Sequence, residues 1–148
     1  MNLVSKQFVE NCSCKKIPIS EIFSYENQTI PEMKKIMTFN LGLAGPQVGI
    51  NRTFFIFRYG NEILSVYNPE WEPETEKRAA SKESCLTYGT RRTTCVMRYK
   101  TIIAEFTNGE GVPVRMKLRG RDAIVFQHES DHLKGKTIFF DPEKGGKK

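Results

Sequence analysis

The chain has 148 residues, and its 23 Lys and Arg residues against 17 Asp and Glu residues give a net charge of +6 and a pI near 9.2. This length suits one domain that buries most of the surface of its unfolded chain, so we expect residues 1–148 to form a single domain. No run approaches the roughly 18 apolar residues of a membrane span, and the N-terminus lacks the apolar core of a signal peptide, which favours a cytoplasmic protein over a membrane protein.

The basic residues are scattered along the chain, apart from Arg91-Arg92 and the lysines within 144–148. They would suit an acidic partner such as nucleic acid or a ribosome, but a scattered basic surface is usually only a solvated one. The four cysteines are unevenly spaced and predict reduced thiols, although their even number also permits disulfides.

Residues 1–28 combine a predicted short helix around 5–10 with Cys12-Ser13-Cys14, whose spacing differs from the C-x₂-C of zinc modules. Next, Thr29 and Glu32 fit a capping box with Pro31 in the first turn, which predicts the start of a helix. An apolar stripe at helical spacing indicates that this helix packs on the core, and it comprises Ile30, Met33, Ile36 and Met37.

Residues 40–49 are rich in glycine and small side chains, which predicts a backbone that another group approaches closely. The segment is not a P-loop, because it lacks the Gly-Lys-Ser/Thr ending, and its spacing is not G-x-G-x-x-G. Gln47 is the polar side chain that follows its glycines.

Alternating β-branched and aromatic residues then predict two hairpins. The first joins 53–59 to 62–67 across Gly60-Asn61, and the second joins 93–107 to 112–118 across residues 108–111. A charged, proline-containing loop is predicted for 68–77. Since a helical segment follows, we expect an α+β fold in which antiparallel β-sheets surround a central helix that carries the H-E-x-x-H metal motif described next.

Both histidines of the chain, His128 and His132, lie four residues apart with Glu129 directly after the first. On a helix this spacing places both imidazoles on one face, where they can bind one metal ion, and leaves Glu129 close to a water on that ion. Asp122 suits the N-cap of such a helix, and Lys134-Gly135 suit its end.

A catalytic metal of the zinc type needs a third protein ligand. Zincin-type peptidases commonly take it from a glutamate some twenty residues downstream, but sixteen residues follow His132. The remaining strong candidates are the thiolates of Cys12, Cys14, Cys85 and Cys95.

Three segments together resemble the peptide deformylase family, in the family's order. They are Gly-Leu-Ala-Gly-Pro-Gln at 42–47, Glu-Ser-Cys-Leu-Thr at 83–87 and Gln-His-Glu-Ser-Asp-His-Leu-Lys-Gly at 127–135. The resemblance implies that Cys85 is the third metal ligand beside His128 and His132, and that Glu129 is the general acid and base.

The resemblance also implies roles outside the metal site. The side-chain amide of Gln47 and the backbone N–H of Leu86 would donate to the oxyanion, and the backbone at Leu41 and Gly42 would pair with the substrate as an added strand. The remaining expected substrate contacts are Arg92, Ile124 and Val125, the last two in a pocket for a methionine side chain.

The implied reaction is hydrolysis of the N-formyl group from the initiator N-formylmethionine of nascent peptides, with release of formate. A water activated by the metal would attack the formyl carbon while Glu129 moves the proton. The resemblance points to Fe²⁺ as the native ion, with Zn²⁺, Ni²⁺ or Co²⁺ as substitutes. We expect a monomer that binds neither DNA nor a membrane.

Three departures from the family pattern bear on the substrate groove, namely Asn40, Gly45-Pro46 and Ser84. The chain also resembles a short variant without a long C-terminal helix, since it ends at 141–148. The resemblance therefore does not imply that this chain docks on the ribosome through such a helix. Proximity to the ribosome remains one of two alternatives.

Two rival interpretations remain. An H-E-x-x-H metal endopeptidase would need a downstream ligand that the chain does not supply. A basic nucleic-acid-binding domain with a structural metal would need aromatic and basic residues on one sheet face. The candidates for such a face are too few to favour this interpretation, namely Tyr59, Tyr67, Tyr99 and Arg98.

Overall fold

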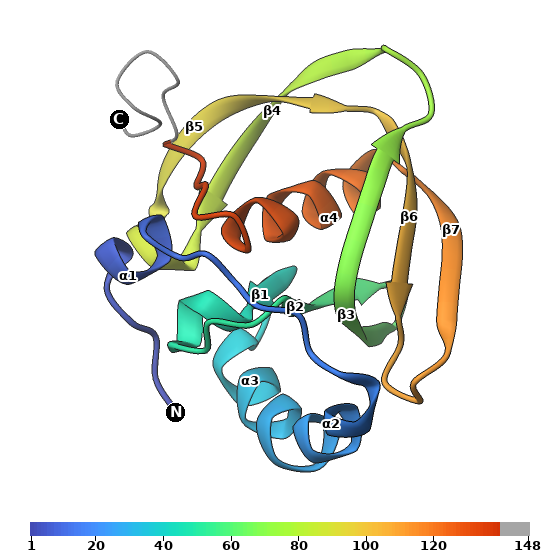
Figure 1. The fold of residues 1–148 in the computed structure, drawn as a ribbon. Coiled ribbons are helices and arrows are strands. Elements are labelled where there is room, and N and C mark those ends of the chain that lie inside the picture. The colour runs from blue at the N-terminus through green and yellow to red at the C-terminus, as the bar shows by residue number, and fades with distance from the viewer. Residues whose placement is uncertain (140–148) are drawn as a thin grey trace.

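The computed structural model describes residues 1–139 and contains two antiparallel sheets around the helix α4 (Gly120–His132) (Figure 1). The larger sheet has the strand order β1-β2-β3-β6-β7, and the smaller one pairs β4 with β5. The expected α+β class with antiparallel sheets is thereby confirmed. The strands are β1 (Gly42–Ala44), β2 (Phe54–Tyr59), β3 (Glu62–Pro73), β4 (Arg78–Cys85), β5 (Gly89–Tyr99), β6 (Thr101–Thr107) and β7 (Pro113–Arg119).

The other helices lie in the N-terminal part of the chain. They are α1 (Lys6–Glu10), α2 (Ile19–Ser24) and α3 (Ile30–Met37), and 3-10 turns follow β1 (Gly45–Val48) and β4 (Leu86–Tyr88). The predicted capping box at Thr29 is wrong, because a π-helical turn (Tyr25–Thr29) joins α2 to α3 and Thr29 itself is helical without a side-chain cap bond. No helix within residues 1–139 is long and apolar enough to span a membrane.

The first predicted hairpin is confirmed, with Tyr59 opposite Glu62 and Gly60 at a positive φ of 61° in the turn. The loop predicted from residue 68 is wrong over its first part, because β3 continues to Pro73 and pairs with β6. The charges that suggested a loop belong to the exposed face of this strand at Glu70 and Glu72, while Trp71 packs against the core.

The predicted single strand over 93–107 is also wrong, since it divides at Lys100. Its first half, β5, pairs with β4 in the small sheet, and its second half, β6, lies between β3 and β7 in the large one. The chain thus changes sheets at this point, which carries β4 and β5 over α4 and away from the other strands (Figure 1).

Strand β2 is buried on both faces, which explains its four consecutive apolar residues. Phe55 and Phe57 belong to a core between the large sheet and α4, whereas Phe54 and Ile56 belong to a core on the α3 side, as the alternation of a strand requires. The first core also contains Val66, Ile102, Ala104, Leu118, Ala123 and Phe126, and the second contains Ile17, Ile22, Ile30, Met33, Met37 and Leu43. The predicted core role of α3 is therefore confirmed.

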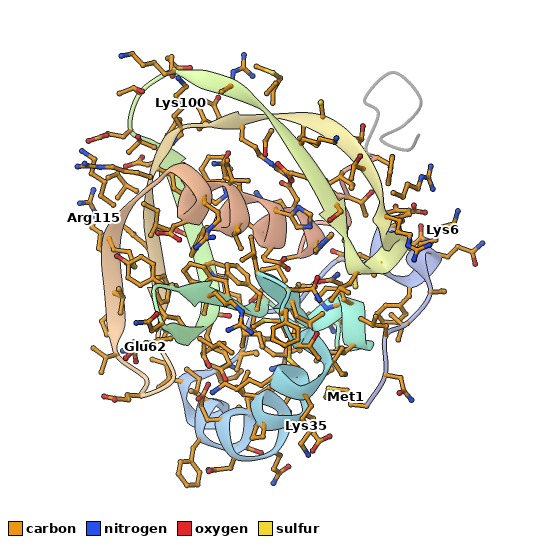
Figure 2. The ribbon with its side chains drawn as sticks, turned by 180° about the vertical axis from the view of Figure 1, so that it is seen from behind. Met1, Lys6, Lys35, Glu62, Lys100 and Arg115 are labelled. Atoms are coloured by element: carbon orange, nitrogen blue, oxygen red, sulfur yellow. The ribbon has the colours of Figure 1, made fainter. Side chains whose placement is uncertain are left out.

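Helix α4 follows β7 directly, so that its start differs from the prediction. Arg119 is the N-cap residue and Gly120, with φ of 56°, turns the chain into the helix, which places Asp122 in the first turn instead of at the cap. The long cationic side chains point outward from separate elements, as Lys35, Lys100 and Arg115 show (Figure 2). The lysines within 144–148 and the prediction that no long C-terminal helix follows concern residues outside the described part of the chain.

Candidate metal centre

Three potential ligands meet between β4 and α4. Cys85 is the last residue of β4, and His128 and His132 lie one turn apart on α4. Their donor atoms all lie within 4.8 Å of one another, with Cys85 Sγ 3.4 Å from His132 Nε2. Within residues 1–139 this is the one such group of at least three histidine, cysteine or carboxylate side chains, and its members are buried.

The outer nitrogens of both rings are already engaged. His128 Nδ1 donates to Glu83 Oε1 at 2.8 Å, and His132 Nδ1 donates to the carbonyl oxygen of Lys136 at 3.0 Å, since both partners are acceptors. These bonds leave both Nε2 atoms on the side of Cys85. Such an outer partner fixes the ring orientation and tautomer of a metal-binding histidine.

Glu83 is held in turn by Arg98, which donates from Nε and Nη2 to its two oxygens at 2.9 and 2.8 Å. Arg98 Nη1 also donates to Asp131 Oδ2 at 2.6 Å, on α4. Burial alone would raise the pKa of Glu83, but the hydrogen bonds from His128 and Arg98 outweigh it and lower that pKa to about 2. Glu83 is therefore ionised and anchors His128.

The charge state of Cys85 also suits a metal ligand. Burial would raise its pKa, but the neighbouring charges and hydrogen bonds of His132 and His128 outweigh burial and lower the pKa to about 5. The same pairing raises the pKa of both histidines against the effect of their burial. A thiolate beside two imidazoles is a donor set suited to Zn²⁺ or Fe²⁺, and binding such an ion would displace the imidazole protons.

Glu129 lies beside this cluster without belonging to it. A Cβ atom on Gly42 would stand 2.7 Å from Glu129 Oε1, so only glycine leaves room for the carboxylate at this point of β1. Glu129 Oε2 is buried and has no hydrogen-bond partner within the described residues. Burial raises the pKa of Glu129 above its ordinary value, although the nearby histidines act to lower it.

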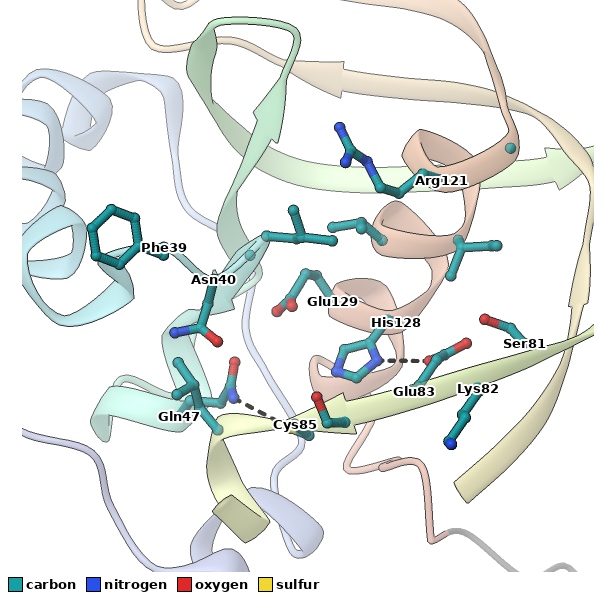
Figure 3. A pocket seen from close by; sticks show the side chains of 17 residues that line it. Phe39, Asn40, Gln47, Ser81, Lys82, Glu83, Cys85, Arg121, His128 and Glu129 are labelled. Carbon is teal, nitrogen blue, oxygen red and sulfur yellow. Dashed lines mark hydrogen bonds and ion pairs between the residues drawn. The ribbon is translucent and has the colours of Figure 1, made fainter. Parts of the chain in front are cut away.

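A cleft of about 520 Å³ opens onto these groups (Figure 3). At its floor Gln47 Nε2 donates to Thr87 Oγ1 at 3.1 Å and lies 3.6 Å from Cys85 Sγ, while Gln47 Oε1 accepts from the N–H of Ala44 at 2.9 Å. Leu86 begins the 3-10 turn after Cys85. An amide in the first turn of a helix has no partner within it and can donate elsewhere.

The cleft brings together nearly all of the residues that the sequence singled out: Leu41, Gly42, Gln47, Cys85, Leu86, Ile124, Val125, His128 and Glu129. Two of them do not line it. His132 lies behind the cleft, 3.4 Å from Cys85 Sγ, and the guanidinium of Arg92 lies over the rings of Phe139 at 4.0 Å and Tyr88 at 5.5 Å. Of the three departures from the family pattern, Asn40 and Ser84 line the cleft and Gly45-Pro46 do not. A Cβ on Gly45 would instead meet the ring of Phe54 at 2.5 Å.

Two contributors escaped the sequence reasoning. Glu83 was noticed only as part of a motif, and Arg98 only as a surface cation, yet their buried pair supports His128. The available signal was the two-residue spacing of Glu83 and Cys85, which places both side chains on one face of a strand.

Known proteins of similar sequence and fold are peptide deformylases. The model of the family described as polypeptide deformylase matches residues 10–146. A peptide deformylase of Thermotoga maritima is 37% identical over 126 residues, which cover 82% of this chain and 74% of that protein. The crystal structure of peptide deformylase from Thermotoga maritima has a TM-score of 0.84 at 32% identity and covers 93% of each chain. That of a peptide deformylase from Synechococcus elongatus in complex with actinonin has a TM-score of 0.85 at 28% identity, covering 95% of this chain and 77% of the other.

Proposed function

This chain belongs to the polypeptide deformylase family, and from that membership we propose that it hydrolyses the formyl group from the initiator N-formylmethionine of nascent peptides and releases formate. The observation that carries the proposal is the buried convergence of Cys85, His128 and His132 beside the carboxylate of Glu129. We further propose that it acts in the cytoplasm as a monomer.

Peptide deformylases are metalloenzymes, and the donor set of this chain fits a divalent ion. Cys85, with its lowered pKa, and the Nε2 atoms of His128 and His132 would hold it. When bound, such an ion supplies a water whose pKa is lowered from 15.7 toward about 7, together with positive charge for the reacting carbonyl. We propose Fe²⁺ as the native ion, with Zn²⁺, Ni²⁺ or Co²⁺ as substitutes.

Glu129 is the group that we propose moves the protons of the reaction. Its side chain packs against the backbone of Gly42, and its Oε2 atom has no hydrogen-bond partner within the described residues. A buried carboxylate with a raised pKa can take a proton from the attacking water and return it to the leaving amine. The proton therefore stays at the Glu129 carboxyl between these two transfers.

Negative charge that develops on the formyl oxygen needs donors that are already in place. Gln47 is held rigidly by its bond to the N–H of Ala44, which orients its amide nitrogen toward Cys85 and Thr87. We propose that Gln47 Nε2 and the backbone N–H of Leu86 stabilise this charge, because donors fixed in advance need no rearrangement during the reaction.

The substrate backbone is proposed to lie along β1. This strand ends the order of the large sheet and pairs with β2 alone, so its other edge can accept an added strand at Leu41 and Gly42. The methionine side chain would then contact Ile124 and Val125, which line the cleft from α4 about one turn before His128.

The test is formate release from a formyl-methionyl peptide by protein purified without oxygen, with its metal content measured. We expect stoichiometric formate from the formylated peptide and no cleavage of the same peptide without the formyl group. Cleavage of internal peptide bonds would instead identify an endopeptidase, and inertness of metal-loaded protein toward formyl-methionyl peptides would contradict the proposal.

The proposed metal is tested by loading the protein with each ion in turn. Ferrous iron next to a thiolate is open to oxidation, so the iron form should be fast but decay in air, and the nickel or cobalt form should be fast and durable. The zinc form should be durable and slower. Equal rates for iron and zinc, or an iron form that is stable in air, would reject Fe²⁺ as the working ion.

A further inference from the structure

Arg121 lines the cleft at the end of α4 remote from Cys85 (Figure 3). Its side chain is exposed, and it makes no hydrogen bond or ion pair with any residue in the part of the chain that the structure describes. It does not support the fold through such a bond, unlike Arg98, which is buried between Glu83 and Asp131. The cleft therefore offers one free guanidinium to whatever occupies it.

Arg121 lies on the path that we expect a bound peptide to take along α4. His128, the pair Ile124-Val125 and Arg121 succeed one another at intervals of three to four residues, so each step along the helix is about one turn, or roughly 5.4 Å. In an extended peptide, side chains two residues apart project to the same side and lie roughly 6.6 Å apart. With the formyl group at His128 and methionine at Ile124-Val125, the third residue of the peptide reaches Arg121.

The other charged residues of the cleft do not alter this site. Lys82 lies on the exposed face of β4, and its side chain points away from α4 (Figure 3). Glu83 is fully engaged by Arg98 and His128, and Glu129 is buried at the floor. Among the described residues that line the cleft, no exposed carboxylate competes for Arg121.

We propose that Arg121 is a specificity residue, which favours peptides with aspartate or glutamate at the third position after formylmethionine at position one. This inference rests on the proposed function and names the substrate class of the same site. A guanidinium pairs with a carboxylate through charge-assisted hydrogen bonds. Because Arg121 is exposed, we expect a preference of about two- to fivefold in kcat/KM that weakens as salt is added.

The experiment uses peptides that differ only in charge at one side chain. Formyl-Met-Ala-Glu and formyl-Met-Ala-Gln are compared as C-terminal amides, so that no terminal carboxylate can substitute for the side chain. Formyl-Met-Glu-Ala and formyl-Met-Gln-Ala amides serve as a second pair, in which the side chain alternates to the opposite face. We expect a preference for glutamate at position three that exceeds the preference at position two.

Three variants connect this preference to Arg121. Arg121→Gln should abolish it, and Arg121→Glu should reverse it in favour of formyl-Met-Ala-Lys amide. Arg119→Gln is the matched control, because Arg119 is also exposed, lies two residues away and does not line the cleft. It removes the same charge and should leave the preference intact. An unchanged preference in Arg121→Gln, or an equal loss in Arg119→Gln, would overturn the assignment.

A binding measurement separates this inference from the proposed function. The dissociation constants of the Glu and Gln peptides are measured on metal-loaded Glu129→Gln protein, in which hydrolysis is not required. If the wild type deformylates both peptides at equal rates and the variant binds both with equal affinity, the role of Arg121 is overturned and the proposed function stands. Tighter binding of the Glu peptide without deformylation by the wild type supports Arg121 and rejects the function. If neither peptide is bound by the variant or deformylated by the wild type, both proposals are rejected.

Discussion

Two cysteine-bearing regions border different faces of α4 and differ in the chemistry of their sulfurs. Cys85 shares a cleft with His128 and Glu129, whereas Cys12 and Cys14 share another with Ser130 and Leu133. The pKa of Cys85 is lowered to about 5, while burial raises the pKa of Cys12 and raises that of Cys14 to about 12. One region presents a thiolate and the other presents thiols.

The neighbours of each sulfur explain this difference. Two imidazoles stabilise the thiolate of Cys85, but Cys12 Sγ donates to Asn51 Oδ1 at 3.4 Å, and each sulfur of the pair meets the other. Burial opposes ionisation of both thiols, and a thiolate at Cys12 would add negative charge beside Cys14. Proximity of two cysteines in sequence therefore does not make a metal site, and the charges around a sulfur decide whether it can bind one.

Removal of Cys85 should have the largest effect on this contrast. In Cys85→Ala the two histidines remain, but a metal site with three protein ligands loses its only thiolate. We expect metal affinity to fall by more than the roughly 10- to 100-fold that loss of an outer partner causes, with loss of deformylation. Metal content after dialysis and formate release measure the two effects.

The control for Cys85→Ala is the double variant Cys12→Ser with Cys14→Ser, which changes two sulfurs outside the cleft. It should retain the metal content and the rate of the wild type, because neither sulfur lines the cleft. Loss of the metal in this control would mean that the N-terminal pair is the binding site, and the comparison would then be reversed.

Within the Cys85 region, Glu129→Gln should separate proton transfer from metal binding. The amide keeps the size of the side chain against Gly42 but cannot accept the proton, so we expect a loss of about 10²- to 10⁴-fold in kcat. Metal content should stay at the wild-type level. If the metal is lost together with the activity, Glu129 acts as a ligand and its assigned role is wrong.

Gln47→Leu should have the next largest effect, because it removes a donor to charge that exists only in the transition state. The loss of one such donor costs about 2.7–4 kcal/mol, or roughly 10²- to 10³-fold in kcat, with little change in KM. Leucine also breaks the bond to the N–H of Ala44, so an unfolding curve is needed as a control. A change confined to KM would move Gln47 into ground-state substrate binding.

The sequence predicted the parts of this molecule that depend on short-range periodicity. Four-residue spacing indicated a helix with His128 and His132 on one face, and the structure places both on α4. Alternation predicted the β2–β3 hairpin. The pairing of strands far apart in the sequence was harder to predict. The charged residues Glu70 and Glu72 suggest a loop, and only their pairing with β6 shows that they belong to a strand.

The same limit applies to the candidate site. Spacing left four cysteines as candidates for a third ligand, and resemblance to a family singled out Cys85, 43 residues before His128. Resemblance also selected Arg92, but this side chain stacks on Phe139 while Arg121 lines the cleft. Which of several nearby cations faces a groove depends on packing that neither spacing nor a motif encodes.

Glu83→Gln should have a smaller effect than the changes at Cys85, Glu129 and Gln47, and it tests what orients His128. The amide can still accept one hydrogen bond from His128, but it loses the charge that attracts both His128 and Arg98. Loss of such an outer partner typically lowers metal affinity about 10- to 100-fold. Titration with a competing chelator measures this change, and an unaltered affinity would show that Glu83 does not orient His128.

The same variant should change the dependence of stability on pH. The pKa of Glu83 is lowered to about 2 in the folded protein from 4.5, so its ionised form stabilises the fold above about pH 5, and this contribution is lost as the pH falls toward 2. Glutamine does not titrate, so the free energy of unfolding of the metal-free variant should be lower at pH 7 and decline less steeply between pH 6 and 3. Arg98 keeps its bond to Asp131, which limits the loss at pH 7. Urea unfolding at each pH measures both quantities, and parallel pH profiles for variant and wild type would show that the Glu83 carboxylate contributes nothing to stability.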